Sequence, residues 1–194
     1  MRKLNAWMFM TLDGVTDAPE KFALADDEMF SAMEADYSAA DVLLLGRRTY
    51  ETFAASWPER GSDVANADWM NQTPKLVAST TLDAPQWQNT TVIEGDVTAA
   101  LTALKQDPGK NILVNGSATL VRSLLHDNLL DELTLYVHPV VLGAGARLFV
   151  NDVDRIALKL CAARTYNNGV VALTYQAGGG SDADPSVAAA LAAA

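Results

Sequence analysis

Cysteine and histidine are scarce in this sequence of 194 residues, and their scarcity excludes several kinds of site. Cys161 is the single cysteine, so neither a disulfide within the chain nor a zinc site built from several cysteines can form. His126 and His138 are the two histidines, and no spacing of acidic residues indicates a further set of ligands. We therefore predict no metal site. A chain of this length buries roughly 70% of its unfolded surface and needs no such staple.

Long apolar runs and positive charge are also lacking. No apolar run reaches the roughly 18–20 residues that cross a bilayer. The basic start, Arg2-Lys3, is not followed by the apolar core and cleavage site of a signal peptide. Fourteen basic residues stand against 24 acidic ones, which gives a formal net charge of -10. This balance opposes default binding to nucleic acid or anionic membranes, so we expect a cytoplasmic protein in which any basic site is local.

The sequence does contain a regular alternation of strand and helix patterns. Buried strands are predicted at residues 3–10, 42–45, 75–79, 91–93, 112–114 and 132–138, and helices at 26–40, 49–55, 96–106 and 118–126. The last two strands, 156–166 and 170–176, flank Asn167-Asn168-Gly169 and are typical of a hairpin. The pattern predicts an α/β fold with flanking helices and a mostly parallel central sheet whose C-terminal edge is antiparallel. We expect one domain over residues 1–177 and a flexible Gly/Ala-rich tail over residues 178–194.

Three predicted strand-to-helix junctions have the chemistry of phosphate binding. They are Gly46-Arg47-Arg48-Thr49, Ser79-Thr80-Thr81 and Asn115-Gly116-Ser117-Ala118-Thr119. A helix N-terminus offers unpaired N–H groups, glycine admits a phosphate close to the backbone, and arginine adds permanently charged donors. Together the segments predict a dinucleotide site, although Gly-x-Gly-x-x-Gly is absent. Taken singly, each has a plainer interpretation: an arginine paired with Glu51, a turn or helix cap at Ser79, and a tight turn at Gly116.

These segments fall in an order that resembles the dihydrofolate reductase superfamily. The matching motifs are Thr11-Leu12-Asp13-Gly14 and residues 43–51, 115–120, 130–133 and 138–143. More narrowly, they resemble the branch typified by the C-terminal reductase domain of RibD, the deaminase–reductase of riboflavin biosynthesis. The resemblance spans residues 3–176. It implies the three-layer dihydrofolate reductase-like fold, with NADPH as the cofactor.

The resemblance also implies roles for individual residues. The cofactor phosphates would be held at Gly46, Arg47, Arg48 and Thr49, the adenosine end at Ser79 and Thr80, and the pyrophosphate at Asn115, Gly116, Ser117, Ala118 and Thr119. Ala6 and the loop after Met10 would approach the nicotinamide. Asp13 would face the substrate as the candidate catalytic residue, and Tyr50, Phe53 and Trp57 would line the substrate pocket. The alternatives are a turn role for Asp13 and ordinary core packing for Tyr50 and Phe53.

Two departures from classical folate reductases restrict the substrate prediction. The slot of their proton-donating helix carboxylate falls at or near Phe30, and the single Gly116 stands where they have a glycine pair. The zinc deaminase pattern is absent as well, so we expect a stand-alone reductase module.

The prediction is an NADPH-dependent reductase of a small pyrimidine- or pteridine-like heterocycle, similar to 5-amino-6-(5-phosphoribosylamino)uracil reductase or dihydrofolate reductase. The alternative is a noncatalytic NADP(H)-binding or regulatory protein on the same fold, and a structural interaction module is the third hypothesis. An exposed apolar edge on the C-terminal hairpin would suit a homodimer.

Overall fold

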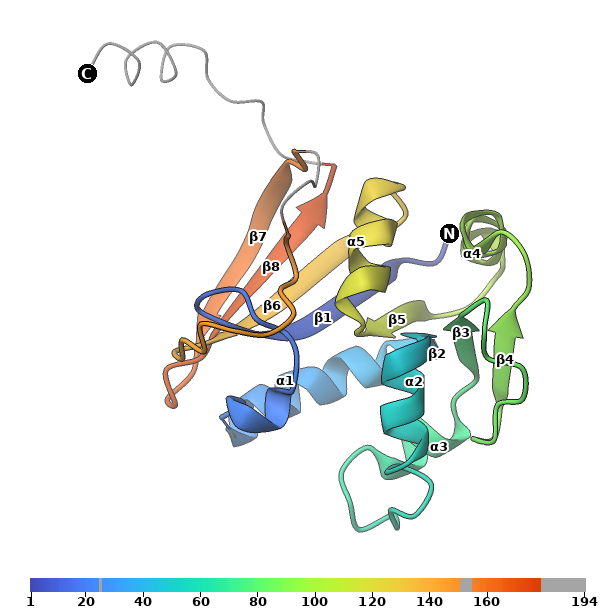
Figure 1. The fold of residues 1–194 in the computed structure, drawn as a ribbon, viewed down its shortest axis with the longest axis horizontal. Helices are drawn as coiled ribbons and strands as arrows, with labels where there is room; N and C mark the ends of the chain where they lie inside the picture. The colour runs from blue at the N-terminus through green and yellow to red at the C-terminus, as the bar shows by residue number, and fades with distance from the viewer. Residues whose placement is uncertain (25, 151–154, 179–194) are drawn as a thin grey trace.

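A computed structural model describes residues 1–24, 26–150 and 155–178, and its centre is a twisted eight-stranded sheet (Figure 1). The strands are β1 (Leu4–Thr11), β2 (Ala40–Gly46), β3 (Lys75–Ala78), β4 (Thr90–Ile93), β5 (Asn111–Asn115), β6 (Glu132–His138), β7 (Leu158–Thr165) and β8 (Val171–Ala177). Their order is β4-β3-β2-β5-β1-β6-β8-β7. All pairs from β4 to β6 are parallel, whereas β8 is antiparallel to both β6 and β7. The predicted fold class is confirmed.

The helices begin at residues that suit helix starts. They are α1 (Asp27–Ser38), α2 (Arg47–Ala54), α3 (Ala67–Gln72), α4 (Val97–Gln106) and α5 (Ala118–His126), with a short 3₁₀ helix at Pro19–Lys21. The side chains of Asp26, Asp96 and Ser117 cap α1, α4 and α5 by accepting backbone N–H bonds from the first turn. Helix α3 has six residues and lies in the connection between α2 and β3. None of the described helices combines the length and the apolar character that a membrane span requires.

The central strands are apolar on both faces because helices cover both sides of the sheet. Helices α1, α2 and α3 pack on one face through Met29, Tyr50 and Met70. Helices α4 and α5 pack on the other face, where Leu101 and Val121 lie. Strand β1 alternates between these two cores, and for this reason its sequence lacks the polar alternation of a half-exposed strand.

The segment after β3 departs from the prediction. Ser79-Thr80-Thr81 does not begin a helix; it opens a loop that leads to β4. The Ser79 hydroxyl accepts hydrogen bonds from the backbone N–H groups of Thr81 and Leu82, which makes a turn. Pro85 disfavours helical backbone at the residue before it, so a helix cannot readily extend through this loop. The first helix after β3 is α4, which starts only after β4.

The C-terminal hairpin forms as predicted. Gly169 has a positive φ of 86°, a conformation that favours glycine, and Tyr166 and Val170 pair across the turn. Strand β8 is the inner strand and β7 is the edge of the sheet. Beyond Gly178, the predicted tail lies outside the described residues.

Candidate cofactor cleft

A long cleft of about 1520 Å³ runs along the carboxyl ends of β4, β3, β2, β5 and β1. It lies where ligands of open α/β sheets bind, because the helices that follow neighbouring strands diverge there. Here α2 follows β2 onto one face and α5 follows β5 onto the other, so their N-termini both border the cleft. Pockets for drug-sized ligands usually measure about 300–1,000 Å³, so this cleft offers room for a dinucleotide.

Two glycines at the centre of the cleft lie close to side chains from the helix starts that follow β2 and β5. A Cβ placed on Gly46 would lie 2.5 Å from the Ser117 Oγ, well inside normal contact distance. Gly116 has a φ of 70°, and a Cβ there would lie 3.2 Å from the Thr49 Oγ1. Both glycines line the cleft and add no side chain of their own to it. The glycines therefore create a cradle in which a ligand can approach backbone N–H groups.

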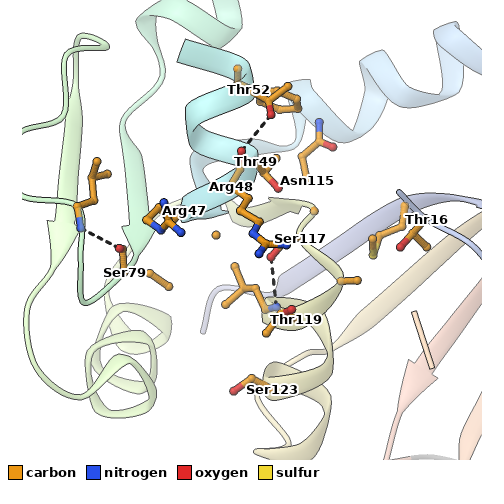
Figure 2. A pocket seen from close by; sticks show the side chains of 18 of the residues that line it. Thr16, Arg47, Arg48, Thr49, Thr52, Ser79, Asn115, Ser117, Thr119 and Ser123 are labelled. Carbon is orange, nitrogen blue, oxygen red and sulfur yellow. Dashed lines mark hydrogen bonds between the residues drawn. The ribbon is translucent and has the colours of Figure 1, made fainter. Parts of the chain in front are cut away.

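The two arginines at the start of α2 differ in their contacts. Arg47 Nη1 donates to Glu51 Oε1 at 2.7 Å, so the predicted alternative of a surface ion pair holds for this residue. The Arg48 guanidinium makes no ion pair or hydrogen bond with any other residue that the structure describes. Both side chains reach into the space between Ser79 and the start of α5 (Figure 2). Because no side chain caps α2, its first N–H groups are also available to an anion.

All the residues predicted to bind cofactor line the cleft except Ala6. Ser79 and Thr80 lie at the end of β3, and Thr119 lies in the first turn of α5. The Asn115 side chain is buried and donates to the Tyr37 hydroxyl at 3.2 Å. Ala6 packs instead into the core beside α5, and its successors Trp7, Met8 and Phe9 form the cleft wall.

Asp13 lies outside the lining of the cleft, and its carboxylate is engaged elsewhere. Its oxygens accept hydrogen bonds from the Thr11 hydroxyl at 2.6 Å and from the N–H groups of Leu142 and Gly143 at 3.2 and 2.9 Å. Arg147 approaches the same carboxylate at 3.5 Å. The Thr11 hydrogen bond, aided by the backbone donors, lowers the pKa of Asp13 to about 2. This geometry matches the turn alternative, in which Asp13 joins two loops.

The residues predicted to line a substrate pocket separate in the structure. Phe53 lines the cleft, whereas Tyr50 and Trp57 do not. Tyr50 is buried in the core, and its hydroxyl accepts a hydrogen bond from the backbone N–H of Trp87 at 3.0 Å. Trp57 stacks with the Arg60 guanidinium, which lies 4.2 Å from the ring centroid. The core-packing alternative therefore describes Tyr50, and Trp57 lies beyond the cleft.

Sequence reasoning missed two segments that the structure brings to the cleft. Glu94 and Gly95 border it at the start of α4, and the position of the Asp96 cap could have indicated this third helix start. The segment from Thr16 to Glu20 borders the opposite end, beside β1. Its sequence carries no recognisable motif. An isolated bridge between Val15 and Arg147 fixes its path, and such a contact between distant residues leaves no local pattern in the sequence.

Comparisons with known proteins agree with this architecture. The model of the RibD C-terminal domain family matches residues 2–172. YyaP, an uncharacterized protein of Bacillus subtilis, is 33% identical over 138 residues, which cover 70% of this chain and 73% of that protein.

Solved structures resemble the whole described fold. A candidate riboflavin biosynthesis protein from Shewanella sp. PV-4 superposes with a TM-score of 0.69 at 19% identity, covering 90% of this chain and 98% of that one. Dihydrofolate reductase from Enterococcus faecalis, solved in complex with NADP(H) and RAB-propyl, gives a TM-score of 0.65 at 15% identity, covering 91% of this chain and 96% of that one. At these identities the likeness shows a shared fold.

Proposed function

The chain belongs to the RibD C-terminal domain family, and we propose that it is an NADPH-dependent reductase of a small pyrimidine- or pteridine-like heterocycle. The observation that carries this proposal is the combination of the glycine cradle and the two arginines in one cleft. Family and structural relatives of the reductase type support it. When bound, NADPH would supply a hydride; the protein supplies binding, orientation and a dry surface.

The residues of the cleft fit such a cofactor from one end to the other. The free N-terminus of α2 and the unpaired Arg48 would hold phosphate groups, and Arg47 would join them by exchanging its bond to Glu51. Gly46 and Gly116 would admit the pyrophosphate to the backbone. Ser79 and Thr80 would lie at the adenosine end, because β3 lies on the far side of β2 from β1.

The β1 end of the cleft would receive the nicotinamide and the substrate. The side chains of Trp7 and Phe9 are largely buried and present aromatic surface there, which excludes water from a reacting ring. Asp13, with a pKa of about 2, stays ionised at neutral pH, so we assign it to holding the neighbouring loops and not to proton donation. The substrate proton would then come from water or from another group at this end.

Binding of NADPH to the purified protein tests the proposal. Trp7 lies in the cleft wall, so intrinsic tryptophan fluorescence should be quenched as NADPH is added. Arg48→Ala should weaken binding by about tenfold, as expected for loss of a charge-assisted phosphate contact. Arg60→Ala is the matched control, because it removes the same charge from a residue outside the cleft lining. No quenching at millimolar NADPH would refute the proposal.

Cofactor oxidation separates the reductase from its noncatalytic alternative. NADPH absorbance is followed with a panel of pterins, pyrimidines and quinones. Oxidation with at least one of them, reduced in Arg48→Ala along with the affinity for NADPH, is the expected result. Tight NADPH binding without oxidation across the panel would favour the regulatory protein on the same fold.

A further inference from the structure

The end of the cleft next to β1 differs in chemistry from its middle. Strand order places β2 and β5 between β3 and β1, so Arg47 and Arg48 stand near the middle of the cleft. Figure 2 shows Thr16 on the opposite side of these arginines from Ser79. The lining at the β1 end includes Trp7, Met8 and Phe9 of β1 itself, and Ala146 and the segment from Thr16 to Glu20, which an isolated bridge brings together.

The charged groups at this end are acidic. Asp17 and Glu20 both border the cleft and are exposed. Within the described part of the chain, neither carboxylate takes part in a hydrogen bond or an ion pair. Arg47 and Arg48 are the two basic residues among the described residues that line the cleft, and both belong to α2. Two further acids, Asp83 and Glu94, border the far end.

Two arginines close to the β1 end are committed to loop structure, whereas Lys21, next to Glu20, lies outside the cleft lining. Arg147 follows Ala146 in sequence, and its Nε donates to the backbone carbonyl of Asp13 at 2.9 Å. Arg122 donates to the carbonyls of Arg147 and Leu148, each at 3.0 Å. These guanidinium groups hold the 142–148 loop against α5 and β1. They would have to break those bonds to contact a ligand in the cleft.

We propose that the substrate is a planar compound that is neutral or positively charged and carries no phosphate group; this inference rests on the proposed function. The aromatic side chains at the β1 end provide flat apolar walls for a ring. A phosphate ester is held by arginine, lysine or a free helix N-terminus, and the cofactor phosphates would use those that the cleft offers. A dianion at the β1 end would instead face the unpaired carboxylates of Asp17 and Glu20, and like-charge juxtaposition suppresses such a ligand.

Matched substrate pairs test this inference. The pairs are 5-amino-6-(ribosylamino)uracil and its 5′-phosphate, and riboflavin and its 5′-phosphate, each titrated by calorimetry into protein saturated with NADP⁺. Saturation occupies the arginines, so only the β1 end is probed. The unphosphorylated member of at least one pair should bind about tenfold more tightly than its phosphate, as expected for repulsion by nearby carboxylates.

Charge-removing variants show whether the acidic pair causes the discrimination. Asp17→Asn combined with Glu20→Gln should reduce the affinity ratio at least threefold. Glu59→Gln combined with Asp68→Asn removes two exposed acids outside the cleft lining and should leave the ratio unchanged.

Three outcomes would overturn the inference: a phosphate that binds as tightly as its partner, a ratio that both double variants leave unchanged, or no binding by any member. In each case NADP⁺ still binds. Failure of NADP⁺ itself to bind would instead refute the proposed function.

Discussion

Replacing Asp36 by asparagine should stabilise the protein at alkaline pH and leave its stability at acidic pH nearly unchanged. Asp36 lies on α1 and lines a second, smaller cavity of about 290 Å³ together with Asn5, Glu132 and Thr134. No described residue forms a hydrogen bond with its carboxylate. Burial, together with the negative charge of Glu132, raises the pKa of Asp36 from 3.8 to about 6.

The sign follows from proton linkage. The folded protein holds the Asp36 proton more tightly than the unfolded chain does, so the destabilisation is complete above about pH 6 and is relieved progressively as the pH falls towards 3.8. A tenfold difference in proton affinity corresponds to about 1.4 kcal/mol, which sets an upper bound near 3 kcal/mol for the cost of the ionised form. Asp36 is partly exposed, and solvent screening reduces this cost, so we expect about 1–2 kcal/mol.

Urea denaturation followed by tryptophan fluorescence measures the effect. At pH 8, Asp36→Asn should raise the free energy of unfolding by about 1–2 kcal/mol, because it removes the ionised carboxylate. At pH 3 the carboxyl is protonated in both the folded and the unfolded protein, and wild type and variant should differ by less than about 0.5 kcal/mol. Glu34→Gln, on the exposed face of the same helix, is the control and should have little effect at either pH. An equal change at both pH values, or a loss of stability at pH 8, would refute the reasoning.

Three further variants probe the cradle and its supports. Gly46→Ala forces its new Cβ against the Ser117 Oγ and should lower stability by about 1–3 kcal/mol while weakening NADPH binding, measured by urea denaturation and fluorescence titration. Lys75→Met leaves three backbone carbonyls without the buried ammonium that now bonds them, and the free energy of unfolding in urea should fall by about 2–4 kcal/mol. Asp13→Asn should lower the melting temperature at pH 7 but change the affinity for NADPH less than twofold. Its effect should fade as the pH is lowered from 4 towards 2, because the lowered pKa of Asp13 contributes stability only while the carboxylate is ionised.

The sequence predicted the fold well where local pattern and burial agree. Buried parallel strands are apolar on both faces, so the β1, β2 and β5 segments could be recognised without any tertiary information. Asp26 and Asp96 cap their helices within one turn, and that interaction is encoded locally. The carboxyl ends of parallel strands necessarily share one edge of a sheet, and this is why most predicted cofactor residues meet in one cleft.

Side-chain direction could not be predicted in the same way. Lys75 begins the strand that leads to Ser79, yet its ammonium turns inward to the carbonyls of Met70, Asn71 and Thr73. Asp13 is followed by glycine and could face either a pocket or a loop; the donors that decide, Leu142 and Gly143, lie almost 130 residues away along the chain. Such partners depend on tertiary contacts that no local pattern contains.

A chain with a net charge of -10 can still offer an anion site, because no acidic side chain caps the N-terminus of α2. Helices α1 and α4 begin with an aspartate cap, which would repel a phosphate and occupies one of the first N–H groups. Gly46 stands at the corresponding position of α2, where the Ser117 side chain that caps α5 lies too close to leave room for another side chain. The packing requirement that excludes a side chain therefore also leaves the α2 N-terminus uncapped, and Arg47 and Arg48 follow it directly. Local packing and anion binding thus both depend on Gly46, so a substitution at this residue should alter both.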